Sequence, residues 1–213
     1  MPRRPDPEIA LKYGDHSGKE PWANFTTGSR IGIIEIITSR LVLRKLDPSD
    51  CAAVFQYRTH PDVSRFQGWG TLTIEDIQEF IEAQGKIDPD TPGTWFQLAI
   101  TLRETGLLIG DCGLHFPADE THQAEIGITL APAYQGKGYA AEALTAVLDY
   151  LFIALGKHRV YGSVDPRNRS SIALLERVGM RKEGHFRESL WFKGEWVDDV
   201  IYAILDREWN KGK

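Results

Sequence analysis

The stretch "LAPAYQGKGYAAEALTAVLDYLF", residues 130–152, decides the fold because it joins a glycine-rich turn to an amphipathic helix. The helical part carries one apolar stripe, formed by Leu144, Leu148, Leu151 and Leu155. This spacing predicts a core-packed helix from Gly138 to about Leu155. Glu142 and Asp149 fall on the opposite side and are expected to face away from the core.

The turn before this helix has the composition of an anion site. In Gly136-Lys137-Gly138 the missing Cβ atoms let successive backbone N–H groups converge, and the helix N-terminus adds roughly half a positive charge. Lys137 strengthens the attraction for a phosphate. The alternative is that the two glycines have only a structural role, in the turn that precedes the helix. That alternative does not explain why Gln135 and Lys137 flank the first glycine.

Two common nucleotide loops do not fit the turn. A Walker loop would need glycine at Ala131 and a magnesium-binding hydroxyl at Gly138. The dinucleotide fingerprint G-x-G-x-x-A is satisfied by residues 136–141, with Asp165 downstream. However, residues 131–135 separate the strand from the glycines, and too little chain follows to complete a doubly wound sheet. A different phosphate ligand is therefore expected.

A third ligand is suggested by a resemblance. The pattern Gln135-x-x-Gly138-x-Ala140, after a strand and opening a helix, resembles the pyrophosphate signature of the GNAT superfamily of N-acetyltransferases. The segment "DPRNRSSIALLERVGMRKEG", with Asn168, Ser171 and Gly179, resembles the strand–loop–helix segment that follows in this superfamily. The similarity runs from about residue 38 to residue 209 and is greatest to the branch of ribosomal-protein alanine N-acetyltransferases.

This resemblance implies that the phosphate belongs to acetyl-CoA, which serves as acetyl donor. The residues implied in the cradle are Gln135, Gly136, Lys137, Gly138, Tyr139 and Ala140.

Composition narrows the class of protein. The 213 residues are 42% hydrophobic and 26% charged, as expected for one soluble globular domain. A net charge of -5 argues against nucleic acid as a partner. Cys51 and Cys112 lie far apart with no metal-ligand spacing, and no signal peptide or long apolar run is present. We expect a cytoplasmic, reduced protein without a metal and without membrane contact.

The pattern of elements predicts an N-terminal arm at residues 1–29 and one N-acetyltransferase domain at residues 30–213. The expected order is β-α-α-β-β-β-α-β-α-β-β, which gives an α/β (α+β) fold with a mixed central sheet and helices on both faces. Hairpins are expected at residues 104–106 and at Lys193-Gly194, and Thr73 is expected to cap a helix. The resemblance adds that this is the acyl-CoA N-acyltransferase fold.

In that fold the strands around residues 125–130 and 159–164 run parallel and splay apart, with pantetheine between them. Splaying leaves backbone groups of Ile128, Thr129 and Leu130 free to bind the pantetheine amides and to polarise the thioester carbonyl. Asn168 is expected to contact the cofactor, although an Asx turn after Pro166 also explains it.

Acetyl transfer to an amine requires a base for the amine and an acid for the leaving thiolate. The resemblance points to Glu125 as the base, acting through water; the alternative is a strand glutamate paired with a neighbouring Lys or Arg. Many members carry a tyrosine acid at the position of Leu175, where this chain cannot donate a proton. Ser171 is the acid that the ribosomal branch offers, unless it only satisfies a helix amide.

Neither cysteine has an activating neighbour and no G-x-S-x-G elbow exists, so no covalent acetyl-enzyme is expected.

The acceptor is the least defined part. Six aromatic residues are candidates for its walls: Tyr57, Phe66, Trp69, Trp95, Phe186 and Trp191. Three acidic residues could hold a cationic acceptor, namely Glu188, Glu195 and Asp198, and His115 is more often structural in such a position. We expect an acetyl-CoA-dependent N-acetyltransferase acting on an amine-bearing small molecule or a protein N-terminus, with a homodimer left open. The alternative is a catalytically silent CoA-binding sensor or interaction module.

Overall fold

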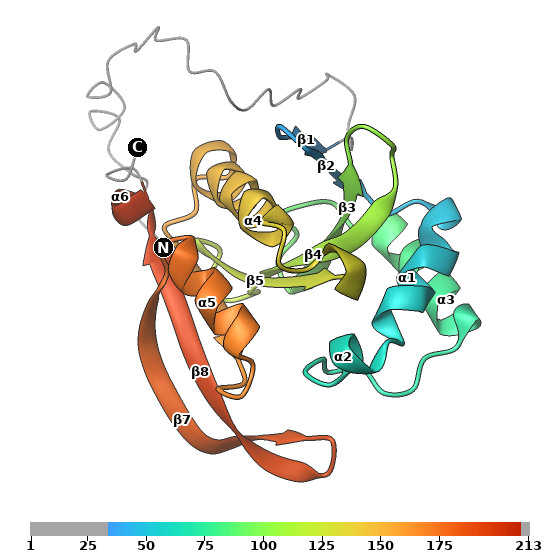
Figure 1. Cartoon of the computed structure of the whole chain (residues 1–213). Coiled ribbons are helices and arrows are strands. Elements are labelled where there is room, and N and C mark those ends of the chain that lie inside the picture. The colour runs from blue at the N-terminus through green and yellow to red at the C-terminus, as the bar shows by residue number, and fades with distance from the viewer. Residues whose placement is uncertain (1–33, 210–213) are drawn as a thin grey trace, which may run out of the picture.

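The computed structural model describes residues 34–209, which fold around one eight-stranded sheet (Figure 1). The strands are β1 (Glu35–Ile37), β2 (Leu41–Lys45), β3 (Thr94–Leu102), β4 (Leu108–Phe116), β5 (Gln123–Leu130), β6 (Arg159–Val164), β7 (Arg181–Phe192) and β8 (Glu195–Leu205). The α-helices are α1 (Cys51–Arg58), α2 (Pro61–Ser64), α3 (Ile74–Gly85), α4 (Tyr139–Asp149), α5 (Arg169–Arg177) and α6 (Asp206–Trp209). The expected arm at residues 1–29 lies outside the described part of the chain, as do residues 30–33 and 210–213 of the expected domain.

The sheet is mixed, with the strand order β1-β2-β3-β4-β5-β6-β8-β7. Every neighbouring pair is antiparallel except β5 and β6. This parallel pair holds together only briefly, since pairing ends where Glu125 lies opposite Tyr161. Beyond that point β5 follows β4 and β6 follows β8, so the two strands diverge. The predicted splayed parallel pair is confirmed.

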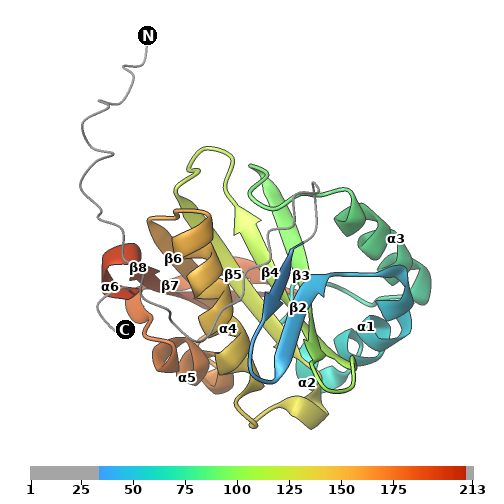
Figure 2. The same cartoon turned by 90° about the horizontal axis from the view of Figure 1, so that it is seen from above.

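Helices cover both faces of the sheet, as predicted. Leu98 and Ile100 of β3 point into the larger apolar cluster, which includes most of α4, while Ala99 between them points into the cluster of α1 and α3. In Figure 2, α4 and α5 lie to the left of the central strands and α1 and α3 to the right. This alternation follows from the two-residue period of a strand, and it leaves two different surfaces on which a site can be built.

Local signals place several boundaries correctly. Thr73 and Asp76 form a capping box at the start of α3, which ends at Gly85. Gly106 has φ +69° in the turn between β3 and β4, and Lys193-Gly194 has positive φ at both residues in the β7–β8 hairpin. No helix within residues 34–209 is long and apolar enough to cross a membrane.

Two expectations for the helix after the glycine turn are wrong. Glu142 and Asp149 were expected to face away from the core, but Asp149 is 4% exposed and accepts a hydrogen bond of 2.8 Å from Trp209 Nε1. Glu142 is held by the β1–β2 turn, as described below. The helix also changes form, because α4 ends at Asp149 and continues as a π-helical turn over Tyr150–Ala154. The short helix α2 after His60 had not been expected.

Candidate active site

Two cavities meet where β5 and β6 diverge. The first, here called the loop cavity, has about 580 Å³ and lies against the glycine turn and the first residues of α4. The second, called the sheet cavity, has about 610 Å³ and lies over the α1 face of β4 and β5. The residues common to both linings are Phe66, Gln67, Ile128, Asn168, Ser171 and Leu174. A molecule lying in one cavity can therefore reach the other through the gap between the strands.

The loop cavity gathers most of the predicted cradle. Gly136 and Gly138 have φ +73° and +81°, a conformation that side-chain-bearing residues rarely adopt. Gly138 is also the N-cap of α4, so helix amides without an intrahelical partner lie at this end. The lining includes five of the six predicted cradle residues, Gln135, Gly136, Gly138, Tyr139 and Ala140, together with Ile128, Thr129 and Leu130. Together they present the features of a phosphate site at a helix N-terminus.

Lys137 is the exception among the cradle residues. Its side chain is absent from the lining, and its ammonium lies 5.5 Å from the ring centroid of Tyr134. Two other cations line the loop cavity instead, Arg65 beyond α2 and Arg177 at the end of α5. Sequence reasoning missed both, because neither belongs to the glycine motif. Gln135 has a structural partner as well, since its Nε2 donates to the carbonyl of Leu130 at 2.9 Å.

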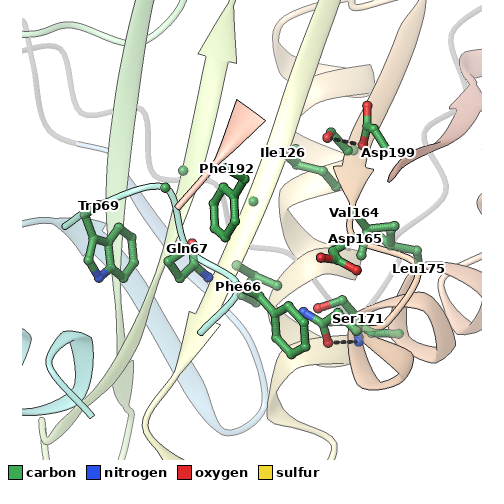
Figure 3. Close-up of a pocket in the computed structure, with 18 of the residues that line it drawn as sticks. Phe66, Gln67, Trp69, Ile126, Val164, Asp165, Ser171, Leu175, Phe192 and Asp199 are labelled. Atoms are coloured by element: carbon green, nitrogen blue, oxygen red, sulfur yellow. Dashed lines mark hydrogen bonds between the residues drawn. The ribbon is translucent and has the colours of Figure 1, made fainter. Parts of the chain in front are cut away.

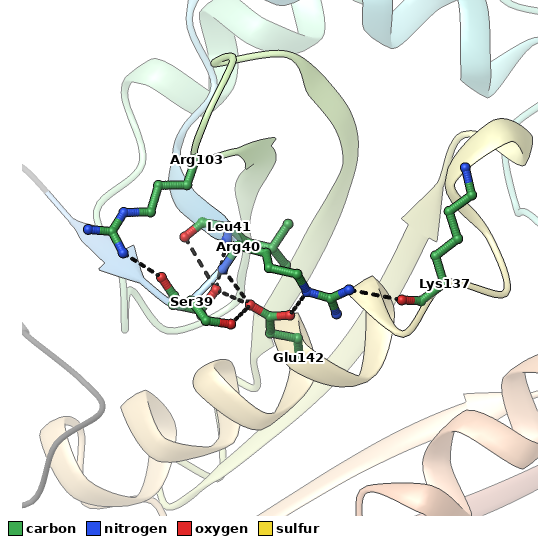
Figure 4. Close-up of polar contacts among 7 residues, drawn as sticks. Ser39, Arg40, Leu41, Arg103, Lys137 and Glu142 are labelled. Atoms are coloured by element: carbon green, nitrogen blue, oxygen red, sulfur yellow. Dashed lines mark hydrogen bonds and ion pairs between the residues drawn. The ribbon is translucent and has the colours of Figure 1, made fainter.

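Glu142 ties the glycine turn to the β1–β2 turn (Figure 4). Its Oε1 accepts hydrogen bonds from Thr38 Oγ1 at 2.6 Å, Ser39 Oγ at 2.9 Å and the Arg40 amide at 2.9 Å. Its Oε2 accepts from Arg40 Nε at 2.6 Å, and Arg40 Nη1 donates onward to the Lys137 carbonyl at 3.1 Å. Burial alone would raise the pKa of Glu142, but these hydrogen bonds outweigh it and hold the pKa below its usual value. We call Thr38, Ser39, Arg40 and Glu142 the carboxylate clamp.

The sheet cavity is walled by segments far apart in sequence (Figure 3). The segment after α2 contributes Phe66, Gln67 and Trp69, and the β7–β8 hairpin contributes Phe192 and Val197. The two walls are joined at the hairpin tip, where Lys193 Nζ donates to the carbonyl of Ser64 at 2.6 Å. The hairpin therefore closes one side of the cavity by its contact with α2.

The floor of the sheet cavity has no side chains at its centre. Gly113 of β4 lies opposite Gly127 of β5, and both line the cavity. A Cβ atom added to Gly127 would meet nothing within 4 Å, whereas one at Gly113 would approach Trp95 and Gln97 at 3.0 Å. The floor is thus open over Gly127, while Trp95 and Gln97 pack over Gly113. We call the opening over Gly127 the trough.

Glu125 lies two residues before Gly127 on β5, on the same face of the strand. It is opposite His115 on β4 and Tyr161 on β6, at the last parallel pair, but it is not part of the cavity lining. Burial raises the pKa of Glu125, and the neighbouring His115 and Tyr161 oppose this rise only in part. No Lys or Arg forms an ion pair with it in the described chain, so the alternative of a salt-bridged strand glutamate is not what residues 34–209 show.

His115 is the neighbour of Glu125 with an unusual environment. Its ring stacks on Trp95 with centroids 5.0 Å apart, and its Nδ1 lies 3.7 Å from Glu125 Oε2. This Nδ1 is buried without a hydrogen-bond partner within the described residues.

The second motif places Asn168 and Ser171 at the junction of the two cavities. Asn168 Oδ1 accepts from the Ser171 amide at 3.2 Å and so caps α5, a local role different from the Asx turn considered above, while the residue still lines both cavities. The Ser171 hydroxyl has no hydrogen bond in the part of the chain that the structure describes. Leu175 also lines the sheet cavity and is 7% exposed, so an apolar side chain occupies the position where many GNAT members carry a tyrosine.

The residues proposed from the sequence to bind the acceptor fall into two groups, those that line the sheet cavity and those that do not. Phe66, Trp69 and Trp95 line the sheet cavity, and Asp198 does so from β8. The remaining candidates do not line it: Tyr57, Phe186, Trp191, Glu188 and Glu195. Tyr57 is buried behind the wall, and Trp191 is 63% exposed on the hairpin. Within residues 34–209 no group of three or more His, Cys, Asp or Glu side chains is placed to hold a metal ion.

Comparison with known families agrees with this geometry. Residues 40–181 match the family described as the acetyltransferase (GNAT) domain. The chain belongs to this family. Relatives in the GNAT family include the N-acetyltransferase YnaD of Bacillus subtilis (strain 168), which is 33% identical over 177 residues, covering 83% of this chain and all of the relative.

Two further GNAT relatives carry names that state an acceptor. The ribosomal protein uS5-alanine N-acetyltransferase of Escherichia coli (strain K12) is 35% identical over 92 residues, which cover 43% of this chain and 47% of the relative. The spermidine N(1)-acetyltransferase of Vibrio cholerae is 28% identical over 174 residues, covering 81% and 97%. The predicted resemblance to the GNAT superfamily, with ribosomal-protein alanine N-acetyltransferases among the relatives, is confirmed.

Solved GNAT structures share the fold. A GNAT-family acetyltransferase from Bacillus anthracis has a TM-score of 0.73 and 32% identity, with 82% of this chain and 99% of that chain covered. Mycobacterium smegmatis RimJ in complex with CoA-disulfide has a TM-score of 0.68 and 25% identity, with 79% and 83% covered. The chain is thus an acyltransferase of the GNAT type.

Proposed function

We propose that this protein transfers the acetyl group of acetyl-CoA directly to a primary amine. The observation that carries the proposal is the junction of the loop cavity and the sheet cavity at the divergence of β5 and β6. A phosphate-bearing donor in the first cavity and an amine in the second would meet through the gap that opens where the pairing of β5 and β6 ends. This geometry suits a transfer between two bound molecules.

The donor assignment is supported by the fit of the cradle. Acetyl-CoA supplies an acetyl thioester at the far end of a pyrophosphate, and the two positive-φ glycines leave room for backbone amides to approach phosphate oxygens. Arg65 and Arg177 add positive charge to the same cavity. A relative of this fold is named as a complex with CoA-disulfide.

Glu125 is the proposed base. The attacking amine must be neutral, and a carboxylate whose pKa is raised by burial accepts its proton more readily than an exposed one. Since the side chain lies outside the cavity lining, the proton reaches Glu125 through a water molecule along the trough over Gly127. Backbone groups of Ile128, Thr129 and Leu130 beyond the parallel pairing are the proposed contacts of the pantetheine arm.

Ser171 is the proposed acid for the departing thiolate. Its hydroxyl lies at the junction of the two cavities and makes no hydrogen bond in the described residues. A covalent acetyl-enzyme is disfavoured by Cys112, whose side chain is 0% exposed and whose thiol pKa is raised by burial. We therefore propose direct attack by the amine.

The proposed acceptor is an α-amine of a protein N-terminus or a small amine, because relatives are named for ribosomal-protein alanine and for spermidine. The alternative is a CoA-binding module without catalysis, which Leu175 favours because it cannot act as an acid. Thiol release from acetyl-CoA with a panel of amines and peptides separates the two. Saturable acetyl-CoA binding with no acceptor-dependent thiol release would leave only the alternative.

The role of Glu125 is tested by Glu125→Gln. We expect kcat to fall by about 10² or more while acetyl-CoA affinity is retained, and we expect the acid limb of the pH–rate profile to disappear. The limb arises because only the ionised carboxylate accepts a proton, so the wild-type rate rises with pH through the raised pKa. Exposed Glu79→Gln on α3 is the matched control and should leave the profile unchanged.

Thermal unfolding of the same variant excludes misfolding as the cause. A folded-state pKa above the unfolded value means that ionisation costs stability, and this cost appears as pH rises through the raised pKa. Glu125→Gln removes the cost, so its melting temperature at pH 7 should equal or exceed that of the wild type. A near-wild-type rate would remove Glu125 from the role of base.

A further inference from the structure

A buried polar network forms the α1 side of the sheet cavity. Asp111 of β4 is 2% exposed, and its Oδ2 accepts from Arg58 Nε at 3.0 Å and Nη2 at 2.9 Å, as well as from the Tyr57 hydroxyl. Its Oδ1 accepts from Gln97 Nε2 at 2.7 Å. Both carboxylate oxygens are thus occupied, and the charge of Arg58 is neutralised in place.

Arg58 is held rigidly but retains unused donors. Its guanidinium lies 4.7 Å from the ring centroid of Trp69 and 4.4 Å from that of Phe80, and Trp69 Nε1 donates to the Arg58 carbonyl at 3.2 Å. The residue is 6% exposed, yet its Nη1 has no hydrogen bond within residues 34–209. This nitrogen is not among the atoms sealed from solvent, and Arg58 lines the sheet cavity. Arg58 is therefore a rigidly held residue of the cavity lining that keeps an unused, solvent-accessible donor.

A neutralised guanidinium selects for a particular ligand group. With its charge balanced by Asp111, Arg58 offers directional N–H donors without excess positive charge, which suits a carbonyl oxygen better than an ammonium. The opposite wall has the contrary character, because Asp198 and Asp199 line the cavity from β8. Asp198 is already engaged by His185 Nε2 at 2.7 Å and by the Glu188 amide at 2.8 Å. Asp199 accepts from Ser163 Oγ at 2.6 Å through Oδ1, which leaves its Oδ2 for an ammonium.

Arg58 and the trough lie on the same face of the sheet. Asp111 lies opposite Thr129 and Gly113 opposite Gly127, so Asp111 and Gly113 are two residues apart on β4 and their side-chain positions share one face. Arg58, which binds Asp111, and Gly127 both line the sheet cavity. An amine over Gly127 and a carbonyl at Arg58 would therefore lie within one cavity.

We infer that Arg58 binds the carbonyl oxygen of the acceptor's amine-bearing residue, so that the acceptor is an α-aminoacyl group and not a polyamine. This inference rests on the proposed function. The α-aminoacyl group can come from a peptide N-terminus or from a free amino acid amide, because both carry an amine and a carbonyl on one carbon. A polyamine has no oxygen with which to occupy the donor, and its binding would leave the buried guanidinium unsatisfied.

The test compares matched acceptors by acceptor-dependent thiol release. The panel contains an alanyl peptide, alanine amide, the peptide isostere in which CH₂ replaces the first carbonyl, and spermidine. In the wild type, loss of the carbonyl should lower kcat/KM about 10-fold to 100-fold. In Arg58→Lys, which keeps a cation beside Asp111 but loses the guanidinium fork, the same pair should differ by less than about threefold. Spermidine, if it is turned over at all, should be equally poor with both enzymes.

Three results bear on the inference in different ways. A wild type that uses the isostere as well as the parent peptide, or prefers spermidine, overturns it. An Arg58→Lys variant that slows every acceptor by one common factor also overturns it, because that is the effect of a structural role. The wild-type comparison stands even if this variant does not fold. Absence of thiol release with every amine, despite acetyl-CoA binding, would instead show that the proposed function fails, and the inference with it. The peptide and alanine amide arms show which source of the aminoacyl group is preferred.

Discussion

Replacing Glu142 with glutamine should loosen the carboxylate clamp that holds the glycine turn. The carboxylate accepts four hydrogen bonds from the β1–β2 turn, and Arg40 passes the constraint on to the carbonyl of Lys137. In Glu142→Gln the three hydrogen bonds to Oε1 are made to a neutral amide oxygen instead of a carboxylate and become weaker. The bond from Arg40 Nε is lost, because the amide NH₂ of glutamine replaces Oε2 and is itself a donor. The variant keeps the volume of the side chain, so packing around α4 is unchanged.

The magnitude follows from these bonds. Hydrogen bonds to charged groups contribute about 1.5–3 kcal/mol and neutral ones about 0.5–1.5 kcal/mol. The Arg40 side chain is 46% exposed, which favours the low end: about 0.5 kcal/mol for each of the three weakened bonds and about 1 kcal/mol for the lost one. The expected loss is about 2–3 kcal/mol in the free energy of unfolding, or about 5–10 °C in melting temperature for a domain of this size.

Thermal unfolding at pH 7 and at pH 3 measures this effect. Because the folded-state pKa of Glu142 lies below its unfolded value, its contribution is complete above the usual glutamate pKa of about 4.3 and is lost as pH falls through the lowered value. The difference between wild type and variant should therefore shrink in acid. Glu82→Gln is the matched control, since Glu82 lies exposed on α3, and its effect should stay within about 0.5 kcal/mol. A melting temperature within about 1 °C of the wild type at pH 7, or a deficit that persists at pH 3, would refute the clamp.

Two glycine substitutions separate the two cavities. Gly138→Val should abolish acetyl-CoA binding measured by calorimetry, because φ +81° disfavours a β-branched residue and a Cβ would lie 3.4 Å from Arg40 Nη2. Unchanged affinity would refute the cradle. Gly85→Ala is the control, since a Cβ at Gly85 would meet nothing within 4 Å. Gly127→Val should lower kcat/KM for the acceptor about tenfold or more, with acetyl-CoA affinity unchanged. A Cβ at Gly127 would meet nothing within 4 Å, so the new side chain would project into the open cavity. Undiminished turnover of the same acceptor would show that the acceptor does not pass through the trough over Gly127.

Much of the fold could be predicted because its signals are local. The capping box at Thr73, the positive-φ turn at Gly106 and the hairpin at Lys193-Gly194 each depend on a few neighbouring residues. The apolar stripe of α4 depends on helical period alone. The short helix α2 had no comparable apolar pattern, because it has four residues and only Val63 is buried.

The errors concern charged side chains whose partners are distant in sequence. Glu142 meets Arg40, which lies 102 residues earlier, and Asp149 meets Trp209, which lies 60 residues later. A helical wheel assigns such carboxylates to solvent because it contains no information about what packs over the helix. Burial of a charge is decided by its partners, and those are set by the folded topology.

The glycine turn and the Asn168 segment could be recognised in the sequence as candidate cofactor-binding segments. A site for phosphate requires particular backbone conformations within a few neighbouring residues, and these leave a local pattern. The sequence by itself thus determined the family and most of the order of elements, and it predicted an anion site at the glycine turn. Only the tertiary structure decided that the loop cavity and the sheet cavity share Ile128, Asn168 and Ser171 where β5 and β6 diverge, and that Arg58 pairs with buried Asp111 in the lining of the sheet cavity. These features join α1, β4, β5 and the β7–β8 hairpin, and contacts between segments so far apart exist only once the sheet has brought them together.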